Sequence, residues 1–433
     1  MKKTVICATG DSLFVARFPA VYGPELERIR DAMAEADLRL TNLETNICPF
    51  GDYAGALSGG TWLNAEPEAL DDLCRFGFDY YATGNNHCMD YSYHGLLSTL
   101  RELDKRGLAH SGTGRSLAEA GAPAILGGAE RTAVICATAS FHDHGKAGNP
   151  SLGYAARPGV NYVRHTETFG VSGEDLRTLR EIADRCGVND SEKLSVSDGF
   201  QTAAEESVFS FGGLRFTEGT ERHSACHPKD LARIAASVRA ARAENDRVIV
   251  MLHSHERKAP NYVEVPEFYE ELAHACVDAG ACAVIGNGSH QLRPVEIYRG
   301  VPVFYSLGDF IYQGMEVPFL PADFMEKYGV PDDSTAAAGL DARSKGGRIG
   351  LQTKRCNFLS ALPLMEFTGS RCTSLSLLPL DLGFEKKSPM KGLPCFADEK
   401  TGREICGILN DVSASYGTRF TFADGKIVCA IPE

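Results

Sequence analysis

Short apolar runs and segments with helical spacing alternate along the first 315 residues. Strand-like runs lie at residues 3–8, 38–43, 80–82, 132–137, 248–252 and 283–285. Helical spacing or helix boundary signals mark residues 24–36, 67–76, 95–105, 228–245 and 268–279. The run at 248–252 is apolar at every position, which is typical of a strand covered on both faces. This alternation predicts an α/β protein.

Two segments interrupt the alternation. Residues 141–226 are polar and glycine-rich, with one helix predicted at 174–186. Because this segment has few apolar residues to bury, we expect it not to fold alone. We expect it instead to lie over the strand ends as an insertion that shapes the substrate pocket. Residues 314–354 are rich in Pro, Gly, Asp and Ala and predict a long loop.

The remaining segments complete the domain interpretation. Residues 358–367 and 373–380 predict strands, residues 400–416 predict a helix, and hairpin turns are indicated at Arg299-Gly300 and Asp424-Gly425. We therefore expect a core at residues 1–315 that contains the insertion. A C-terminal extension at residues 316–433 then returns strands and a helix to that core.

Composition narrows the class of protein. The 433 residues are 43% hydrophobic and 23% charged, as in ordinary globular proteins. The net charge of −13 disfavours nucleic-acid binding, which needs a basic surface. No apolar run approaches the length of a membrane span, and the N-terminal run is too short for a signal peptide, so we expect a cytoplasmic protein. The 14 cysteines form no CxxC pair and are expected to be reduced thiols.

Candidate chemistry is concentrated where predicted strands end. The clusters are Gly10-Asp11-Ser12, Thr41-Asn42-Leu43-Glu44, Gly84-Asn85-Asn86-His87 with Asp90, His253-Ser254-His255-Glu256, and Gly286-Asn287-Gly288-Ser289-His290. Any one of them has an ordinary explanation as a helix cap, a solvated strand end or a core histidine. Five in succession favour convergence on one site, because open α/β sheets bind ligands at the carboxyl ends of their strands. Oxygen and imidazole ligands suit Mn, Fe, Zn or Ca.

The ordered motifs resemble the CapA-type capsule-synthesis and poly-γ-glutamate-synthesis family. The motifs are Gly10-Asp11, Asn42-Leu43-Glu44, Asn85-Asn86-His87-x-x-Asp90-Tyr91, the strand end at His253, Gly286-x-Gly-x-His290, Glu296-Ile297-Tyr298-Arg299-Gly300 and Tyr305-Ser306-Leu307-Gly308-Asp309-Phe310. The resemblance is strong over residues 3–140 and 228–315. That family is similar to calcineurin-like metallophosphatases, which implies a four-layer αββα sandwich.

The resemblance also implies residue roles. Asp11 and Glu44 would be carboxylate ligands of one or two divalent ions, with Glu44 bridging them. Asn86, His253 and His290 would complete the ligand set, and His87 would be a general acid oriented by Asp90. Two positions depart from the pattern, since Leu13 and Asn287 stand where the related families usually have histidine. Asn287 still offers an amide oxygen, as a weaker ligand.

We expect the substrate to be an anionic small molecule or a peptide. Asn42, His255 and Glu256 share the strand ends and are expected to contact it. Arg157 and Arg164 lie in the insertion and would clamp a carboxylate or phosphate, with a solvated loop as the open alternative. Nothing in the sequence indicates an oligomeric state.

Three functions remain open. The first is a metal-dependent hydrolase of a phosphoester or of a peptide-like amide such as poly-γ-glutamate, using a metal-activated water. The second is a peptide epimerase in which Asp11 and His290 supply the acid–base pair. The third is a non-catalytic component of capsule assembly, which would predict a membrane anchor.

Overall fold

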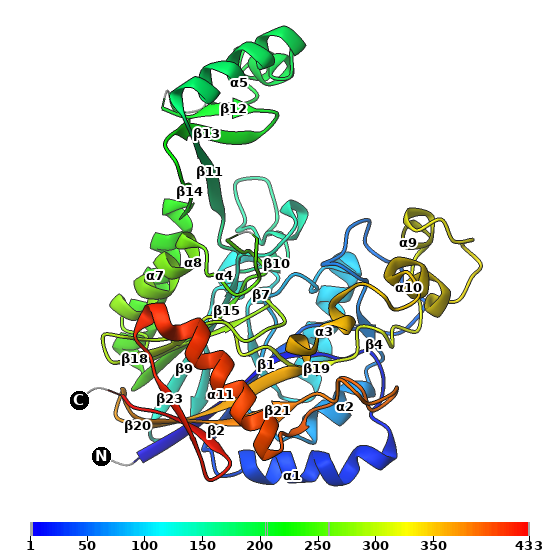
Figure 1. Cartoon of the computed structure of the whole chain (residues 1–433), viewed down its shortest axis with the longest axis vertical. Coiled ribbons are helices and arrows are strands. Elements are labelled where there is room, and N and C mark those ends of the chain that lie inside the picture. Colours follow the sequence, from blue (N-terminus) through cyan, green and yellow to red (C-terminus); the bar gives the residue numbers. More distant parts are fainter. Residues whose placement is uncertain (1–2, 204, 206, 259, 432–433) are drawn as a thin grey trace.

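The structure is organised around a ten-stranded sheet. The computed structural model describes residues 3–203, 205, 207–258 and 260–431 (Figure 1). The path along this sheet runs β23 (Phe420–Ala423), β24 (Lys426–Cys429), β21 (Arg371–Asp381), β20 (Leu359–Thr368), β1 (Lys3–Leu13), β2 (Leu38–Leu43), β5 (Tyr80–Ala82) and β6 (Ala109–Ser111). The last four strands are parallel, and β19 (Asp309–Tyr312) also pairs with β1 in parallel. The predicted C-terminal strands therefore extend the sheet that β1 begins.

A second, six-stranded sheet lies against the first. Its order is β17 (Val295–Tyr298), β18 (Val301–Phe304), β16 (Ala283–Asn287), β15 (Arg247–His253), β9 (Arg131–Thr138) and β8 (Ala124–Gly127). The four central strands are parallel, and β8 and β17 close the edges in antiparallel pairs. All residues of β15 are buried, as its uninterrupted apolar run predicts.

Apolar side chains alternate between two cores because successive residues of a strand point to opposite faces. Ile6 and Tyr80 belong to the core between the two sheets, whereas Cys7 and Tyr81 face the opposite side. Helices α1 (Gly23–Met33) and α2 (Ala69–Cys74) cover that outer face, and α7 (Pro228–Glu244) and α8 (Glu267–Asp278) cover the outer face of the six-stranded sheet. The predicted α/β class is confirmed. Within the described ranges, no helix is both long and apolar enough to cross a bilayer.

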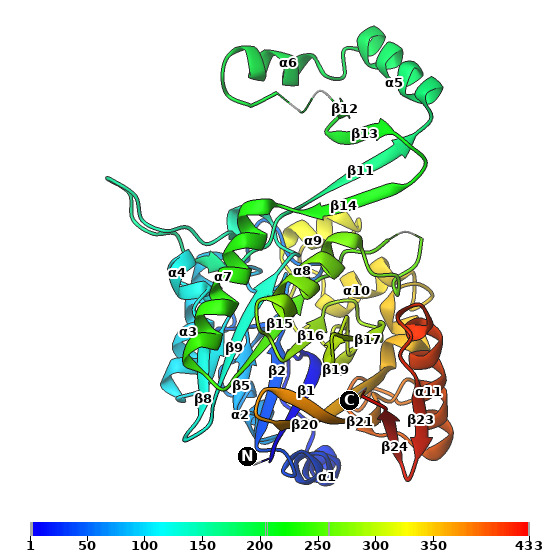
Figure 2. The same ribbon diagram turned by 90° about the vertical axis from the view of Figure 1, so that its left-hand side faces the viewer.

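The insertion adopts a form that its polar sequence did not reveal. Residues 165–226, which we call the arm, form a sheet of order β12 (Phe209–Phe211), β13 (Leu214–Glu218), β11 (His165–Val171) and β14 (Arg222–Cys226), with α5 (Gly173–Cys186) and α6 (Asp190–Ser197). In both views the arm projects away from the two sheets (Figures 1 and 2). Our expectation that this whole segment lies over the strand ends is wrong, because pairing of β11 with β14 carries the chain outward.

The segment predicted as a long loop also contains helices. They are α9 (Ala322–Lys327) and α10 (Ala336–Ser344). The hydroxyl of Thr335 caps α10 by accepting a hydrogen bond from the backbone N–H of Ala338. The helix α11 (Glu399–Ser413) in the C-terminal extension packs Ile405 and Leu409 into the core between the sheets.

Candidate metal centre and cavity

The two sheets present their strand ends to the same place. In the large sheet, Asp11 of β1 is in register with Asn42 of β2 and with Asp309 of β19. In the other sheet, His253 of β15 is in register with Asn287 of β16. Residues separated by nearly 300 positions thus meet at one edge, as expected of strand ends in an α/β fold.

Asp11 is fully buried and firmly held. Its Oδ1 accepts a hydrogen bond of 2.6 Å from the amide of Asn42, and its Oδ2 accepts one of 2.8 Å from the backbone N–H of Gly288. Gly288 has φ 107°, and a Cβ there would lie 2.9 Å from the backbone of Ser254. Burial alone would raise the pKa of Asp11, but the imidazoles of His253 and His290 outweigh it and hold the pKa below its ordinary value.

Glu44 has the opposite environment. It is fully buried, yet neither carboxylate oxygen has a hydrogen-bond partner among the described residues. Burial, reinforced by the charges of Asp11, Asp309 and Asp90, raises the pKa of Glu44 well above its ordinary value. A buried carboxylate without donors is costly unless it binds a proton or a cation.

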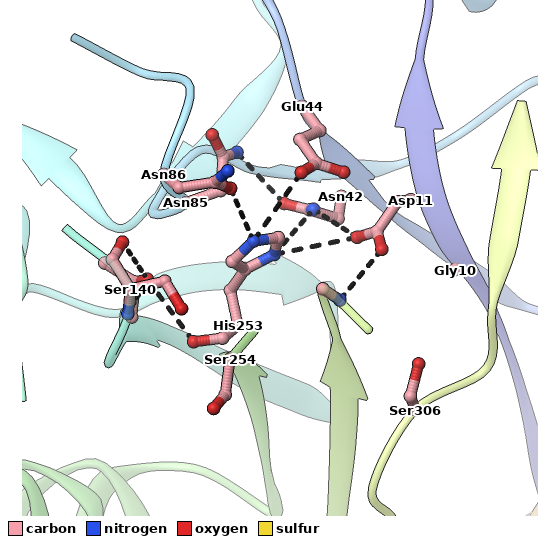
Figure 3. A network of polar contacts seen from close by, with 12 residues as sticks. Gly10, Asp11, Asn42, Glu44, Asn85, Asn86, Ser140, His253, Ser254 and Ser306 are labelled. Atoms are coloured by element: carbon pink, nitrogen blue, oxygen red, sulfur yellow. Dashed lines mark hydrogen bonds and ion pairs between the residues drawn. The ribbon is translucent and has the colours of Figure 1, made fainter. Parts of the chain in front are cut away.

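Imidazole and amide groups surround one side of Glu44. The Nε2 atoms of His253 and His255 each lie 3.6 Å from its Oε1. The Oδ1 of Asn86 lies 2.8 Å from Nε2 of His253 and 3.1 Å from Nε2 of His255, while its amide nitrogen donates to the carbonyl of Gly59. Figure 3 shows Asn86, Glu44 and Asp11 all turned toward the ring of His253. Burial and the neighbouring imidazoles hold the pKa of His255 well below its ordinary value, which favours the neutral ring.

Carboxylates dominate the other side. Ligand atoms of Asp11, Glu44, His290 and Asp309 all lie within 4.8 Å of one another, as do those of Glu44, His253 and His255. Nδ1 of His290 is 2.8 Å from Oδ1 of Asp309. Burial raises the pKa of Asp309 to about 6, against the opposing effect of His290. The two groups share Glu44.

The residues present fit a divalent cation. The donors are carboxylate oxygens, imidazole nitrogens and an amide oxygen, a set suited to borderline or hard ions. Besides Glu44, atoms of Asn287 and Asp309 are buried without partners within the described part of the chain. Unpaired acceptors around a shared carboxylate are what a bound cation would satisfy.

His87 stands at the edge of this cluster. Its Nδ1 lies 2.6 Å from Oδ2 of Asp90, and its Nε2 lies 3.9 Å from Oε1 of Glu44. Asp90 is itself held by the backbone N–H groups of Gly59 and Leu63 at 2.8 Å. The ring therefore has a fixed orientation, with Nε2 directed toward the cluster.

A cavity of about 600 Å³ opens beside the cluster. His87, His255 and His290 form its wall on the metal side. The remaining wall comes from the loop at residues 59–63 and from Arg257, Tyr262, Tyr312, Tyr328, Arg343 and residues 349–352. Leu13, at a position where related families usually have histidine, also contributes to the lining.

The expected substrate arginines lie elsewhere. Arg164 forms a two-pronged ion pair with Asp230, and Nε of Arg157 donates to the carbonyl of Lys146. None of residues 141–226 that the structure describes lines this cavity, and the pocket-shaping role expected of that segment stays a prediction. The sequence at 314–354, predicted only as a loop, supplies that wall instead. Arg257 and Arg343 were missed because no motif marks them.

Other expected contacts are rearranged. Asn42 is buried and donates a hydrogen bond to Asp11. Glu256 accepts hydrogen bonds from the hydroxyls of Ser140 and Ser254. His255, expected to contact substrate, also reaches Glu44. Asp309 was missed as a site residue, although it lies in the Gly308-Asp309-Phe310 motif that carried the resemblance.

Comparison with known proteins places the chain in a bacterial family. A family model described as bacterial capsule synthesis protein PGA_cap matches residues 5–314. An uncharacterized protein of Sinorhizobium fredii is 30% identical over 431 residues, which cover 96% of this chain and 91% of that relative.

More distant relatives match a smaller part. A probable polyglutamine synthesis accessory protein of Mycobacterium tuberculosis is 26% identical over 284 residues, 64% of this chain and 57% of that protein. The PGA biosynthesis protein CapA of Bacillus subtilis is 24% identical over 252 residues, 58% of this chain and 47% of that protein. The resemblance drawn from the motifs is thereby confirmed, and the chain belongs to the bacterial capsule synthesis protein family PGA_cap.

Proposed function

We propose that this protein is a metal-dependent hydrolase of metallophosphatase type that cleaves a phosphoester or a peptide-like amide in an anionic substrate. The observation that carries the proposal is the carboxylate of Glu44, buried without a donor among the described residues and shared by two groups of ligand atoms. The helix–sheet–sheet–helix layering supports the same function class. The relatives from Mycobacterium and Bacillus are named for polyglutamine synthesis and PGA biosynthesis, which supports a polyglutamate-type substrate.

The proposed ligands divide between two subsites. Asp11, Asp309 and His290 would hold a cation on the carboxylate side, and His253, His255 and Asn86 would hold one on the imidazole side, with Glu44 common to both. Bound divalent ions supply Lewis-acid polarisation of the substrate oxygen and lower the pKa of a water molecule. Asn287, as the weaker amide at its position, favours unequal affinities for the two ions.

His87 is the proposed general acid. Its Nδ1 is engaged by Asp90, which leaves Nε2 to carry the proton that the leaving group receives. His87 lines the cavity, so that proton is accessible to a bound substrate. The backbone N–H groups of Gly59 and Leu63 hold Asp90, and Asp90 holds the ring, so the proton is delivered from a fixed position.

The test uses purified full-length protein loaded with Mn, Fe, Zn or Ca. Substrates would be p-nitrophenyl phosphate, bis-p-nitrophenyl phosphate and a γ-linked glutamate peptide. We expect hydrolysis of at least one, lost on treatment with EDTA and in Glu44→Ala. A fully loaded protein that hydrolyses none of them, or a Glu44→Ala variant with full activity, would contradict the proposal.

A second candidate is a peptide epimerase. Leu13 and Asn287 favour it, because two imidazoles usual at these positions are missing from the ligand set. His290 lines the cavity and could exchange a proton with a substrate Cα, but Asp11 is fully buried and does not line it. Incorporation of solvent deuterium at a peptide Cα by EDTA-treated protein would establish this reaction in place of hydrolysis.

A further inference from the structure

The cavity is also lined by cations that have no acidic partner among the described residues. Arg257 and Arg343 both line the cavity, and no carboxylate lies within ion-pair distance of either in the described part of the chain. Three arginines elsewhere in the fold are each paired with an aspartate: Arg17 with Asp72, Arg39 with Asp79 and Arg164 with Asp230. In a chain of net charge −13, unpaired guanidinium groups that face a cavity are a binding feature.

Aromatic contacts fix the first of these arginines in place. The guanidinium of Arg257 lies 4.5 Å from the ring centre of Tyr262, and the ammonium of Lys354 lies 4.7 Å from the same centre. Tyr262 also lines the cavity. Cation–π contacts of this kind hold the cation without neutralising it. Arg257 therefore keeps its charge and its hydrogen-bond donors for a ligand.

A buried arginine holds the loop that carries Arg257 and Tyr262. Arg293 is fully buried, and it donates to the backbone carbonyls of Tyr262 at 2.9 Å and Glu256 at 2.6 Å. It also donates to the carbonyl of Ser254 at 3.4 Å. Both ends of the loop at residues 254–262 are thus tied to one side chain, so the positions of His255 and Arg257 are set together.

The second arginine comes from a different part of the chain. Arg343 lies near the end of α10, donates to the hydroxyl of Thr61, and lies 5.6 Å from the ring centre of Phe324. Thr61 belongs to the loop whose residues Gly59 and Leu63 hold Asp90. A guanidinium has five N–H donors, so Arg343 retains free donors after this contact.

We propose that Arg257 and Arg343 form an anion-binding subsite for a carboxylate or phosphate group remote from the scissile bond. This subsite depends on the proposed function in one respect only: the reacting group of the substrate is taken to lie where His87, His255 and His290 line the cavity. A cavity of about 600 Å³ accommodates a substrate that spans from the histidines to the arginines. The subsite selects substrates with an anionic group at that distance and leaves neutral analogues weakly bound.

The first test measures binding without catalysis. Metal-free full-length protein is titrated calorimetrically with inorganic phosphate and with glutarate, and the tighter probe identifies phosphate or carboxylate as the group preferred. We expect Arg257→Ala and Arg343→Ala each to weaken that probe roughly 10–100-fold, the range for a lost charge-assisted hydrogen bond. The affinity of Arg343→Lys for the probe should lie between those of the unmodified protein and Arg343→Ala, because lysine keeps the positive charge but lacks the planar set of N–H donors of a guanidinium.

Arg348→Ala is the matched control. Arg348 lies in the same segment as Arg343 and is exposed, and among the described residues its side chain donates only to the carbonyl of Lys345. Its binding of either probe should equal that of the unmodified protein. Absence of binding in the unmodified protein, or binding in both alanine variants that equals binding in the unmodified protein, overturns the subsite.

A second measurement separates this subsite from the hydrolase. With an active metal-loaded protein, the arginine variants should raise KM at least tenfold while metal content stays unchanged. Unchanged KM in both variants overturns the subsite and leaves the hydrolase standing. Loss of probe binding in the variants of a protein that hydrolyses nothing supports the subsite and rejects the hydrolase.

Discussion

Asp90 and His87 form a fixed pair beside the candidate metal centre. Oδ2 of Asp90 lies 2.6 Å from Nδ1 of His87, and both oxygens of the carboxylate accept backbone hydrogen bonds from the loop at residues 59–63. The same loop contacts Arg343 through Thr61. The proposed proton donor and the proposed anion subsite are therefore attached to one segment.

Replacement of His87 by alanine should lower kcat roughly 10²–10⁴-fold, the usual contribution of a general acid. Metal content should be nearly unchanged, because His87 belongs to neither group of candidate ligand atoms and its Nδ1 is engaged by Asp90. Steady-state kinetics and elemental analysis of the same sample check both statements. Loss of metal in this variant would show that His87 is a ligand and would reject the assigned role.

Glu44 should make the metal-free protein less stable as pH rises. Its folded-state pKa is raised by burial and by Asp11, Asp309 and Asp90, so the folded state binds the proton more tightly than the unfolded state does. Stability is then greatest below the ordinary carboxyl pKa and falls as pH rises toward the folded value. The pKa of Asp309 is raised to about 6, so this residue also makes the folded state less stable as pH rises. The lowered pKa of Asp11 has the opposite effect on stability, at more acidic pH.

The control is Glu44→Gln, which has nearly the same shape and cannot ionise. Thermal unfolding of both EDTA-treated proteins from pH 4.5 to 8 should show a smaller fall in Tm for the variant. Added divalent metal should restore Tm in the unmodified protein only. Parallel curves for the two proteins would mean that Glu44 does not titrate in this window.

Arg293→Met should destabilise the protein and weaken metal binding on the His255 side. It leaves three backbone carbonyls without their donor, at a cost of about 1–3 kcal/mol for each one left unsatisfied. Arg247→Met is the matched control, because Arg247 is equally buried but contacts Thr132, Glu130 and Gly369 away from the site. Metal titration should show a lower metal affinity in Arg293→Met and an unchanged affinity in Arg247→Met. An equal loss of metal affinity in both variants would indicate general unfolding.

The arm should be dispensable for metal binding. Glu167 and Ser224 are directly opposite each other in the pairing of β11 with β14, so residues 168–223 can be replaced by a short glycine–serine linker. None of the described residues of the arm lines the cavity. The shortened protein should keep its metal content and its affinity for phosphate and glutarate, and a loss of either would support a pocket-shaping role for the insertion.

The isolated arm should not fold. Within α5 only Ala183 is buried, and α6 contributes no buried residue. A segment of this size with so little buried surface does not offset its conformational entropy. A circular dichroism spectrum of residues 165–226 with native helix content and a cooperative melt would contradict this.

Sequence patterns located the strands well because each carries its own signal. The predicted bounds at 38–43 and 80–82 coincide with β2 and β5, and the run at 248–252 lies within β15. The arm strands were missed because α5 covers one face only, so no strand has a continuous apolar run. The segment at 314–354 was predicted as a loop because α10 has no clear apolar stripe, although Thr335 gave a capping signal.

The site residues likewise divide into those that a local sequence signal marks and those that depend on tertiary packing. Asp11, Glu44 and His253 could be found from sequence because they lie at or near the carboxyl ends of β1, β2 and β15, and strand ends share an edge. Asp309 begins β19 rather than ending a strand, and its position opposite Asp11 depends on a parallel pairing that spans almost the whole chain. Arg257 and Arg343 depend on tertiary packing of two loops, for which no local pattern exists.

Elemental analysis of the full-length protein, purified without chelator and compared with Glu44→Gln, tests the central claim most directly. The account predicts one or two equivalents of a divalent metal per chain in the unmodified protein and a marked loss in the variant, because Glu44 belongs to both groups of ligand atoms. Metal-free protein that binds none of Mn, Fe, Zn or Ca on titration, or an equal metal content in Glu44→Gln, would contradict it.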